Sequence, residues 1–262
     1  MQRLFFGAHV CAPWPELFPS GRVIGETMRH ITLAFLGACS FSKLQEQLPN
    51  IPPPSFTVGL GGTASRVVFL PPDEQRVAAL ELQWWENPQS LIHYQKNLID
   101  WLTSLGYAFH DQHSFYPHIT IARSPFEKED WKNLVLPIPF YITGIHLYES
   151  MGNLNYQSRW HHPLKPPFVE LEHTADIAFE IRGETMEQLH RHAELALCFI
   201  FPPLAAYTAP IPSQSLDEII IELNNMIATA DTEIGCPFKA VSFHGKIHQS
   251  NHLFCWEMIV DV

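Results

Sequence analysis

The tripeptide His-Ile-Thr occurs twice in this chain, each time within a short apolar run, at residues 28–37 and 114–123. Short runs of this kind are typical of β-strands. In a strand, residues i and i+2 point to the same face, so His30 and Thr32 share one face. The chain is therefore predicted to build two strands that each present an imidazole and a hydroxyl.

The second copy repeats the arrangement with His118 and Thr120. The apolar residues of the two strands are expected to pack on the opposite face, in the core: Ile31, Leu33, Phe35, Ile119 and Ile121. If the strands lie side by side, two imidazoles and two hydroxyls face one groove, which is the predicted active site. In the alternative interpretation, both histidines lie at strand edges with satisfied hydrogen bonds.

Two histidines suit a narrow range of chemistry. Because the pKa of histidine is about 6.5, one imidazole can act as a base at neutral pH while another acts as an acid. Opening a cyclic phosphodiester needs a base to deprotonate water and an acid to protonate the departing ribose oxygen. Threonine hydroxyls can stabilise the charge that develops on the non-bridging oxygens. This chemistry requires neither a metal nor a covalent intermediate.

Residues 29–37 and 116–123 resemble the paired signatures of the two-histidine (2H) phosphoesterase superfamily. Within it, they are most similar to the bacterial and archaeal RNA 2',3'-cyclic phosphodiesterases, also described as 2'-5' RNA ligase-like, and residues 2–8 resemble that family's first strand. The resemblance implies a cofactor-free enzyme that opens the ring to a 2'-phosphate. His30 and His118 would be the catalytic pair.

The same resemblance implies substrate-binding roles for Thr32, Thr120 and Arg123. Strict alternation, however, puts Arg123 on the face of Ile119 and Ile121. It would reach the groove only at a strand end or at a β-bulge. The alternative interpretation is a solvated charge that closes the strand.

The charge distribution indicates two units. Residues 166–262 carry 4 of the 16 basic and 14 of the 27 acidic side chains, so residues 1–165 are almost neutral. A neutral first unit is compatible with binding one RNA end and argues against a broad polyanion-binding surface.

Five scattered cysteines indicate free thiols in a reducing compartment, and no apolar run is long enough to span a membrane, which favours a cytoplasmic protein.

Residues 1–165 are expected to form two similar α+β lobes that each contribute one motif strand. Residues 56–60 and 65–70 are predicted strands with a turn at Gly61 and Gly62, and a helix is predicted to start with Asn87 as its N-cap and Pro88 at its first position. The proline-rich residues 160–167 are the predicted linker.

In residues 166–262, alternating apolar residues at 177–181 predict a strand. Thr185 with Gln188 predicts a capped helix, whose buried residues are expected to be Leu189, Ala193, Ala196 and Ile200.

Residues 173–176, 239–245 and 259–262 are similar to motifs of archease, an acidic helper of the GTP-dependent RNA ligase that acts in tRNA splicing. The domain is shortened between its second helix and Lys239.

The archease resemblance implies a metal site at Asp176, Asp261 and the terminal carboxylate of Val262, and a ligase-activating role for Lys239. Oxygen ligands suit Ca²⁺, Mg²⁺ or Mn²⁺. Without this resemblance, Asp176 would be interpreted as a turn or cap residue and Asp261 as part of a frayed strand end.

The sequence thus predicts an α+β protein: a two-lobed antiparallel-sheet 2H phosphoesterase domain at 1–165 and a smaller archease-like domain at 166–262. The first domain is expected to hydrolyse RNA 2',3'-cyclic phosphate ends, such as those of tRNA halves. The second domain is expected to act as a cofactor of the GTP-dependent RNA ligase. Two alternatives remain open. One is a non-catalytic RNA-end-binding assembly factor for that ligase, and the other is a phosphodiesterase for a small cyclic nucleotide.

Overall fold

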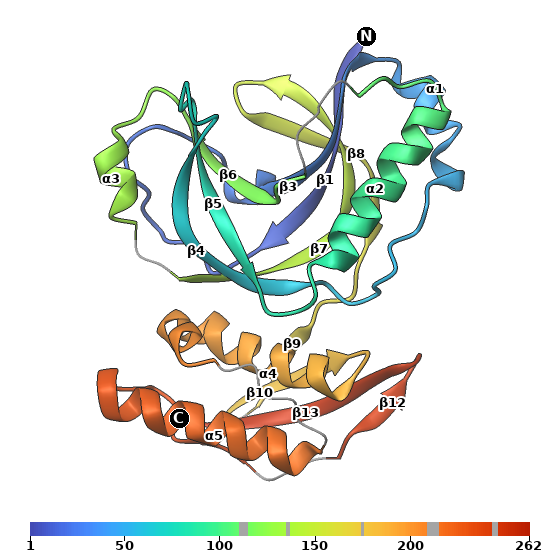
Figure 1. Ribbon diagram of the computed structural model, residues 1–262. Coiled ribbons are helices and arrows are strands. Elements are labelled where there is room, and N and C mark those ends of the chain that lie inside the picture. The colour runs from blue at the N-terminus through green and yellow to red at the C-terminus, as the bar shows by residue number, and fades with distance from the viewer. Residues whose placement is uncertain (110–114, 135–136, 174–175, 209–214, 243–245) are drawn as a thin grey trace.

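The structure is a computed structural model that describes residues 1–109, 115–134, 137–173, 176–208, 215–242 and 246–262. Its strands form two separate antiparallel sheets, and a hydrophobic core is associated with each sheet (Figure 1). Helices accompany both sheets, so the predicted α+β class is confirmed. The first sheet ends at Pro163 and the second begins at Phe168.

The first sheet consists of two halves that each contain one motif strand. One half contains β1 (Gln2–Cys11), β3 (His30–Cys39), β7 (Ile138–Gly152) and β8 (Asn155–Pro163). The other contains β2 (Arg22–Val23), β4 (Gly61–Leu70), β5 (Val77–Trp84) and β6 (His118–Arg123). The halves meet where β3 pairs with β6 and where β4 pairs with β7, and because β1 also pairs with β7 the order β1-β3-β6-β5-β4-β7 closes on itself.

Helix α2 (Gln89–Ser104) packs against the first sheet through residues at helical spacing, Leu91, Tyr94, Leu98 and Leu102. It begins at Gln89, just after the predicted first position Pro88, and the side-chain oxygen of the predicted cap residue Asn87 accepts a hydrogen bond from the backbone N–H of Gln89 at 3.0 Å. The shorter helices of this unit are α1 (Phe41–Gln45), α3 (Lys128–Lys132), η1 (Glu26–Met28) and η2 (Leu48–Asn50).

The predicted turn at Gly61 and Gly62 is wrong, because both glycines lie inside the single strand β4. A Cβ at Gly62 would lie 2.3 Å from the backbone oxygen of Gln83 on β5. Glycine is therefore needed for close approach of the neighbouring backbone and not for a turn. Residues 56–60, predicted as a strand, form only an isolated bridge between Val58 and Lys165.

The second sheet has the order β11-β13-β10-β9, with β12 on β13. Its strands are β9 (Phe168–Leu171), β10 (Ile177–Gly183), β11 (Ala240–Val241), β12 (His248–Ser250) and β13 (Leu253–Asp261). Its helices are α4 (Met186–Ile200), η3 (Pro202–Ala206) and α5 (Leu216–Ile234). The predicted cap is present, since Thr185 Oγ1 accepts from the Gln188 N–H at 3.1 Å, but Ile200 is 44% exposed and does not belong to the buried stripe. None of the described helices combines the length and apolarity needed to cross a lipid bilayer.

Helix α4 lies between the two sheets (Figure 1) and is hydrogen-bonded to the first unit through the carboxylate of Glu86. This carboxylate accepts hydrogen bonds from Gln188 Nε2 at 2.6 Å, from His192 Nε2 at 2.9 Å and from the Gly61 N–H at 2.9 Å. Burial by itself raises the pKa of Glu86, but His192 and the three hydrogen bonds outweigh it, so that the pKa lies below its ordinary value. An ionised carboxylate thus links the units.

Candidate active site

Strands β3 and β6 pair at one position, Ile31 opposite Ile119, and both isoleucines are 0% exposed. In an antiparallel pair, the residue before Ile31 lies across from the residue after Ile119. His30 therefore lies across from Thr120, and Thr32 lies across from His118, on the face opposite the isoleucines. The two histidines are diagonal neighbours, a relation that separates residues by about 7–8 Å. A phosphate that lies between the two histidines can contact both imidazoles.

Both histidines are oriented by the same local hydrogen bond. The Nδ1–H of His30 donates to the backbone oxygen of Met28 at 2.7 Å, and the Nδ1–H of His118 donates to that of Tyr116 at 2.9 Å. In the neutral ring this assignment leaves Nε2 as the acceptor. Among the hydrogen bonds of the described residues, none uses Nε2 of either ring. Each imidazole can therefore offer this nitrogen to a substrate.

A cavity of about 260 Å³ opens beside His30. Its walls include His30 and Thr32, three arginines, and the turn between β7 and β8 at residues 152–154. The arginines come from three strands: Arg3 from β1, Arg22 from β2 and Arg123 from β6. The cavity thus combines an imidazole, a hydroxyl and positive charge, which suits an anionic ligand.

A register irregularity turns Arg123 into this cavity. Along β6, Thr120 pairs with Ala79 and Ala122 pairs with Ala78, so Ile121 is an extra residue. Ile121 and Ala122 are consequently both buried in the core, and the alternation resumes with Arg123 on the groove face. This is the bulge that alternation required for Arg123 to reach the groove.

The same irregularity in β3 overturns the prediction for Phe35, which was expected in the core. Gly7 on β1 pairs with Thr32 and Phe6 pairs with Ala34, so Leu33 is an extra residue. Leu33 and Ala34 are both buried, and Phe35 is turned to the cavity with 50% of its surface exposed. The predicted core positions of Ile31, Leu33, Ile119 and Ile121 are confirmed.

His30 is held in an aromatic enclosure and is only 7% exposed. Its ring centroid lies 4.8 Å from that of Phe5 and 5.2 Å from those of Tyr148 and Tyr156. A Cβ at Gly7 would lie 3.1 Å from His30 Cδ2, so glycine makes room for the ring. Burial lowers the pKa of His30 to about 4, and the positive charges of nearby histidines and Arg123 act in the same direction.

His118 lies in a more open environment, stacked on Tyr116 with ring centroids 5.9 Å apart. The hydroxyl of Tyr116 donates to Glu81 Oε1 at 2.8 Å, which fixes the ring. Burial lowers the pKa of His118, and its hydrogen bond to the Tyr116 carbonyl partly offsets this. The two imidazoles are therefore chemically unequal, with His30 the more strongly biased toward the neutral form.

Sequence reasoning missed a row of histidines that continues from His30 across the sheet. His9 pairs with His30, and ring centroids are 5.5 Å apart both from His9 to His146 and from His146 to His161. Burial lowers the pKa of His9, and burial together with neighbouring histidines lowers the pKa of His146 to about 4. Alternation in the first strand signals Arg3, Phe5, Gly7 and His9 on one face, but the contributions of β7 and β8 have no local signal.

The residues predicted as a metal site gather at the end of the second sheet. Ile177 pairs with Val260, so by register Asp176 lies across from Asp261. Ser242 Oγ donates to Asp261 Oδ1 at 3.4 Å, and the Lys239 ammonium donates to the Val262 carbonyl. Within the part of the chain that the structure describes, no group of three or more His, Cys, Asp or Glu side chains fits a metal ion. Residues 174–175 and 243–245 of the archease-like motifs lie outside the described residues.

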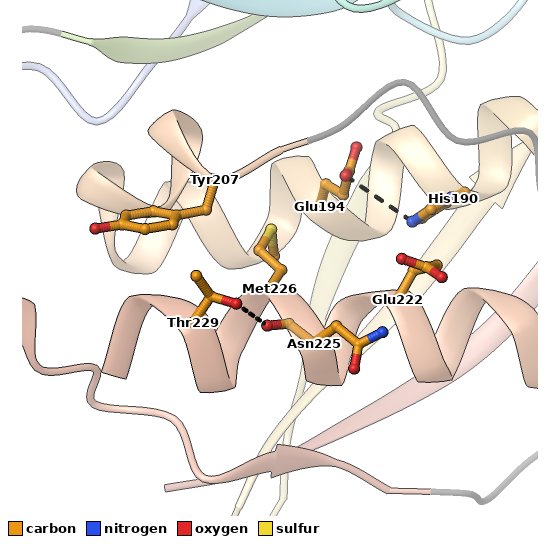
Figure 2. A pocket seen from close by; sticks show the side chains of 7 residues that line it. All are labelled: His190, Glu194, Tyr207, Glu222, Asn225, Met226 and Thr229. Atoms are coloured by element: carbon orange, nitrogen blue, oxygen red, sulfur yellow. Dashed lines mark hydrogen bonds and ion pairs between the residues drawn. The ribbon is translucent and has the colours of Figure 1, made fainter. Parts of the chain in front are cut away.

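A second cavity, of about 150 Å³, lies between α4 and α5 (Figure 2). Its lining includes His190 and Glu194 on α4, whose Nε2 and Oε1 atoms are 3.9 Å apart, and Glu222 on α5. Thr229 hydrogen-bonds the backbone oxygen of Asn225 at 2.8 Å within the same helix. No residue predicted from the motifs lines this cavity, so the cavity at His30 is the candidate active site.

The sequence matches no known family profile and no curated protein. Similar solved structures include a phosphoesterase, with 23% identity and a TM-score of 0.45, and E. coli LigT complexed with 3'-AMP, with 24% identity and a TM-score of 0.45. Another is the protein TT0787 of Thermus thermophilus, with 18% identity and a TM-score of 0.44. Each similarity covers 63% of this chain and 98% of the other. At such values the function has to be inferred from the site itself.

The lowered pKa of His30 predicts that acidification destabilises the protein. The unfolded chain takes up this proton near pH 6.5, but the folded protein does so only near pH 4, so stability decreases as the pH falls between these values. Between pH 7 and pH 5, His30 alone accounts for about 2 kcal/mol of the free energy of unfolding. The free energy of unfolding, measured with urea, should decrease less between pH 7 and pH 5 in the His30→Gln variant than in the wild type. In the control variant His93→Gln, which changes an exposed histidine, this decrease should equal that of the wild type. Equal decreases in all three proteins would contradict the prediction.

Proposed function

We propose that the unit built on the first sheet hydrolyses RNA 2',3'-cyclic phosphate ends to 2'-phosphates by general acid–base catalysis. The observation that supports this most directly is the paired arrangement of His30 and His118. Each ring donates from Nδ1 to a backbone carbonyl, each leaves Nε2 for a substrate, and each has a threonine two residues later on the same face. Such symmetry suits a reaction that needs one proton acceptor and one proton donor.

In the proposed reaction, a phosphate sits between the strands and its non-bridging oxygens accept hydrogen bonds from Thr32 and Thr120. Nε2 of His30 takes a proton from water as the water oxygen bonds to phosphorus. The bond from phosphorus to the 3'-oxygen breaks, and Nε2 of His118 supplies the proton that this oxygen gains. Arg123 offsets negative charge in the transition state. His30 is assigned as the base because its pKa of about 4 keeps it neutral.

For the unit built on the second sheet, we propose the role that the archease resemblance implies, a helper of the GTP-dependent RNA ligase with a hydrated divalent cation. The support is the register that places Asp176 across from Asp261. Two carboxylates are fewer than Ca²⁺ usually takes, but Mg²⁺ is often held by one or two carboxylates and keeps several waters. The cation would link these two strand ends.

Replacing either catalytic histidine tests the phosphodiesterase. The His30→Ala and His118→Ala variants should each lower kcat on a 2',3'-cyclic phosphate RNA end by about 10²-fold or more, since general acid–base catalysis contributes that much. EDTA should leave the wild-type rate unchanged. His93→Ala, an exposed histidine on α2, is the matched control. Full activity in either catalytic variant would remove that histidine from the mechanism.

The pH dependence of kcat/KM tests which histidine is the base. The rate should fall on the acid side near pH 4, where His30 becomes protonated, and on the alkaline side through the pKa of His118, which lies below its ordinary 6.5. The optimum of the free enzyme is thus expected to be mildly acidic. An optimum above pH 7 would contradict these roles.

Calorimetric titration with Mg²⁺ or Mn²⁺ tests the second unit. One cation per chain should bind to the wild type, and Asp261→Asn should weaken binding by tenfold or more, because half of the carboxylate pair is lost. Asp217→Asn, an exposed acid in the first turn of α5, is the control. Binding that is absent from the wild type, or unchanged by Asp261→Asn, would exclude this cation site.

A further inference from the structure

Two arginines lie directly opposite each other on the strands that border the active-site cavity. Strand β2 pairs with β6 so that Arg22 lies across from Arg123, and both residues line the cavity that contains His30. Like charges at directly opposed positions destabilise an antiparallel pair. An anion bound between the two guanidinium groups would offset this repulsion.

Elsewhere in the same sheet, the chain neutralises an arginine across the strands. Arg66 on β4 lies opposite Glu81 on β5, and the two form an ion pair. By contrast, no carboxylate of the described residues forms an ion pair with Arg22 or Arg123. The opposed arginines thus lack the cross-strand carboxylate that Arg66 has, and they occur at the cavity.

The proposed reaction uses only one of these two charges. In that reaction the scissile phosphate lies between the histidines and is contacted by Thr32, Thr120 and Arg123. Arg22 has no role in it. A guanidinium is well suited to phosphate, because its planar fork can donate two parallel hydrogen bonds. Phe35 also lines this cavity; it is half exposed and has the Arg3 guanidinium 5.1 Å from its ring centroid.

We propose that Arg22 is a second phosphate subsite, which binds the phosphodiester on the 5' side of the terminal nucleoside. This inference rests on the proposed function and narrows its substrate class to RNA ends that carry a phosphate besides the cyclic one. Phe35 then offers its ring as a stacking surface for a base, in the way that aromatic side chains bind single strands. Arg22 acts in substrate selection and takes no part in proton transfer.

The test compares two substrates that differ by one phosphate. A dinucleotide that ends in a 2',3'-cyclic phosphate has the additional phosphodiester, and a nucleoside 2',3'-cyclic monophosphate lacks it. The wild type should prefer the dinucleotide in kcat/KM. Arg22→Gln should reduce that ratio about tenfold, the size expected for one charge-assisted hydrogen bond. Lys43→Gln removes one positive charge from an exposed position on α1 and should keep the wild-type ratio.

An unchanged ratio in Arg22→Gln, or an equal reduction in Lys43→Gln, would overturn the second subsite. Circular dichroism and the melting temperature of each variant establish that the ratio compares folded proteins. Since both substrates are measured on the same protein preparation, a partial loss of active enzyme cancels in the ratio.

A binding measurement separates the subsite from the reaction. Calorimetry measures the affinity for a nucleoside 3',5'-bisphosphate and for the 3'-monophosphate. Neither measurement requires turnover. A preference of the wild type for the bisphosphate that is lost in Arg22→Gln supports the subsite even if no cyclic phosphate is hydrolysed, in which case only the proposed reaction fails. Equal affinities of the wild type for the two ligands would overturn the subsite.

Discussion

The candidate active site depends on the single point at which the two motif strands pair, Ile31 opposite Ile119. Burial of these two isoleucines on one face places both His-x-Thr pairs on the other face, because side chains alternate along a strand. A slip of one residue in either strand would turn its histidine and threonine into the core and expose its isoleucines. The hydrophobic core therefore sets the register that brings the two imidazoles to the same face of the paired strands.

Two bulges then modify this simple alternation in the same way. In each motif strand an extra residue follows the threonine, so that two consecutive apolar residues are buried, and the next side chain returns to the groove. In β3 that side chain is Phe35, and in β6 it is Arg123. The same kind of bulge thus turns an aromatic side chain of β3 and a positively charged side chain of β6 toward the cavity. The two side chains stand at equivalent positions along the chain from His30 and His118.

The electrostatics of the groove connect its stability with its chemistry. Burial of His30 beside other histidines and Arg123 keeps its ring neutral, which is the state a proton acceptor needs. The same burial makes the folded protein sensitive to acid, since the unfolded chain binds these protons more readily. Opposed arginines add positive potential beside a neutral base. The residues that line the groove suit an anion, and an anion bound there would relieve the repulsion between Arg22 and Arg123, which form no ion pair with a carboxylate of the described residues.

The sequence by itself determined the α+β class, the strands that carry His30 and His118, and the helix that follows Asn87, because these depend on alternation, helical spacing and capping within a few residues. Only the tertiary structure decided what depends on a neighbour distant in the chain. Gly62 is needed inside a strand, not in a turn, because the backbone of Gln83 approaches it closely, and Phe35 leaves the core because a bulge shifts the pairing of β3 with β1. Arg22 faces Arg123 although the two lie far apart in the chain. Local patterns carry no information about such pairs, since the repulsion or close contact arises only once the strands have paired.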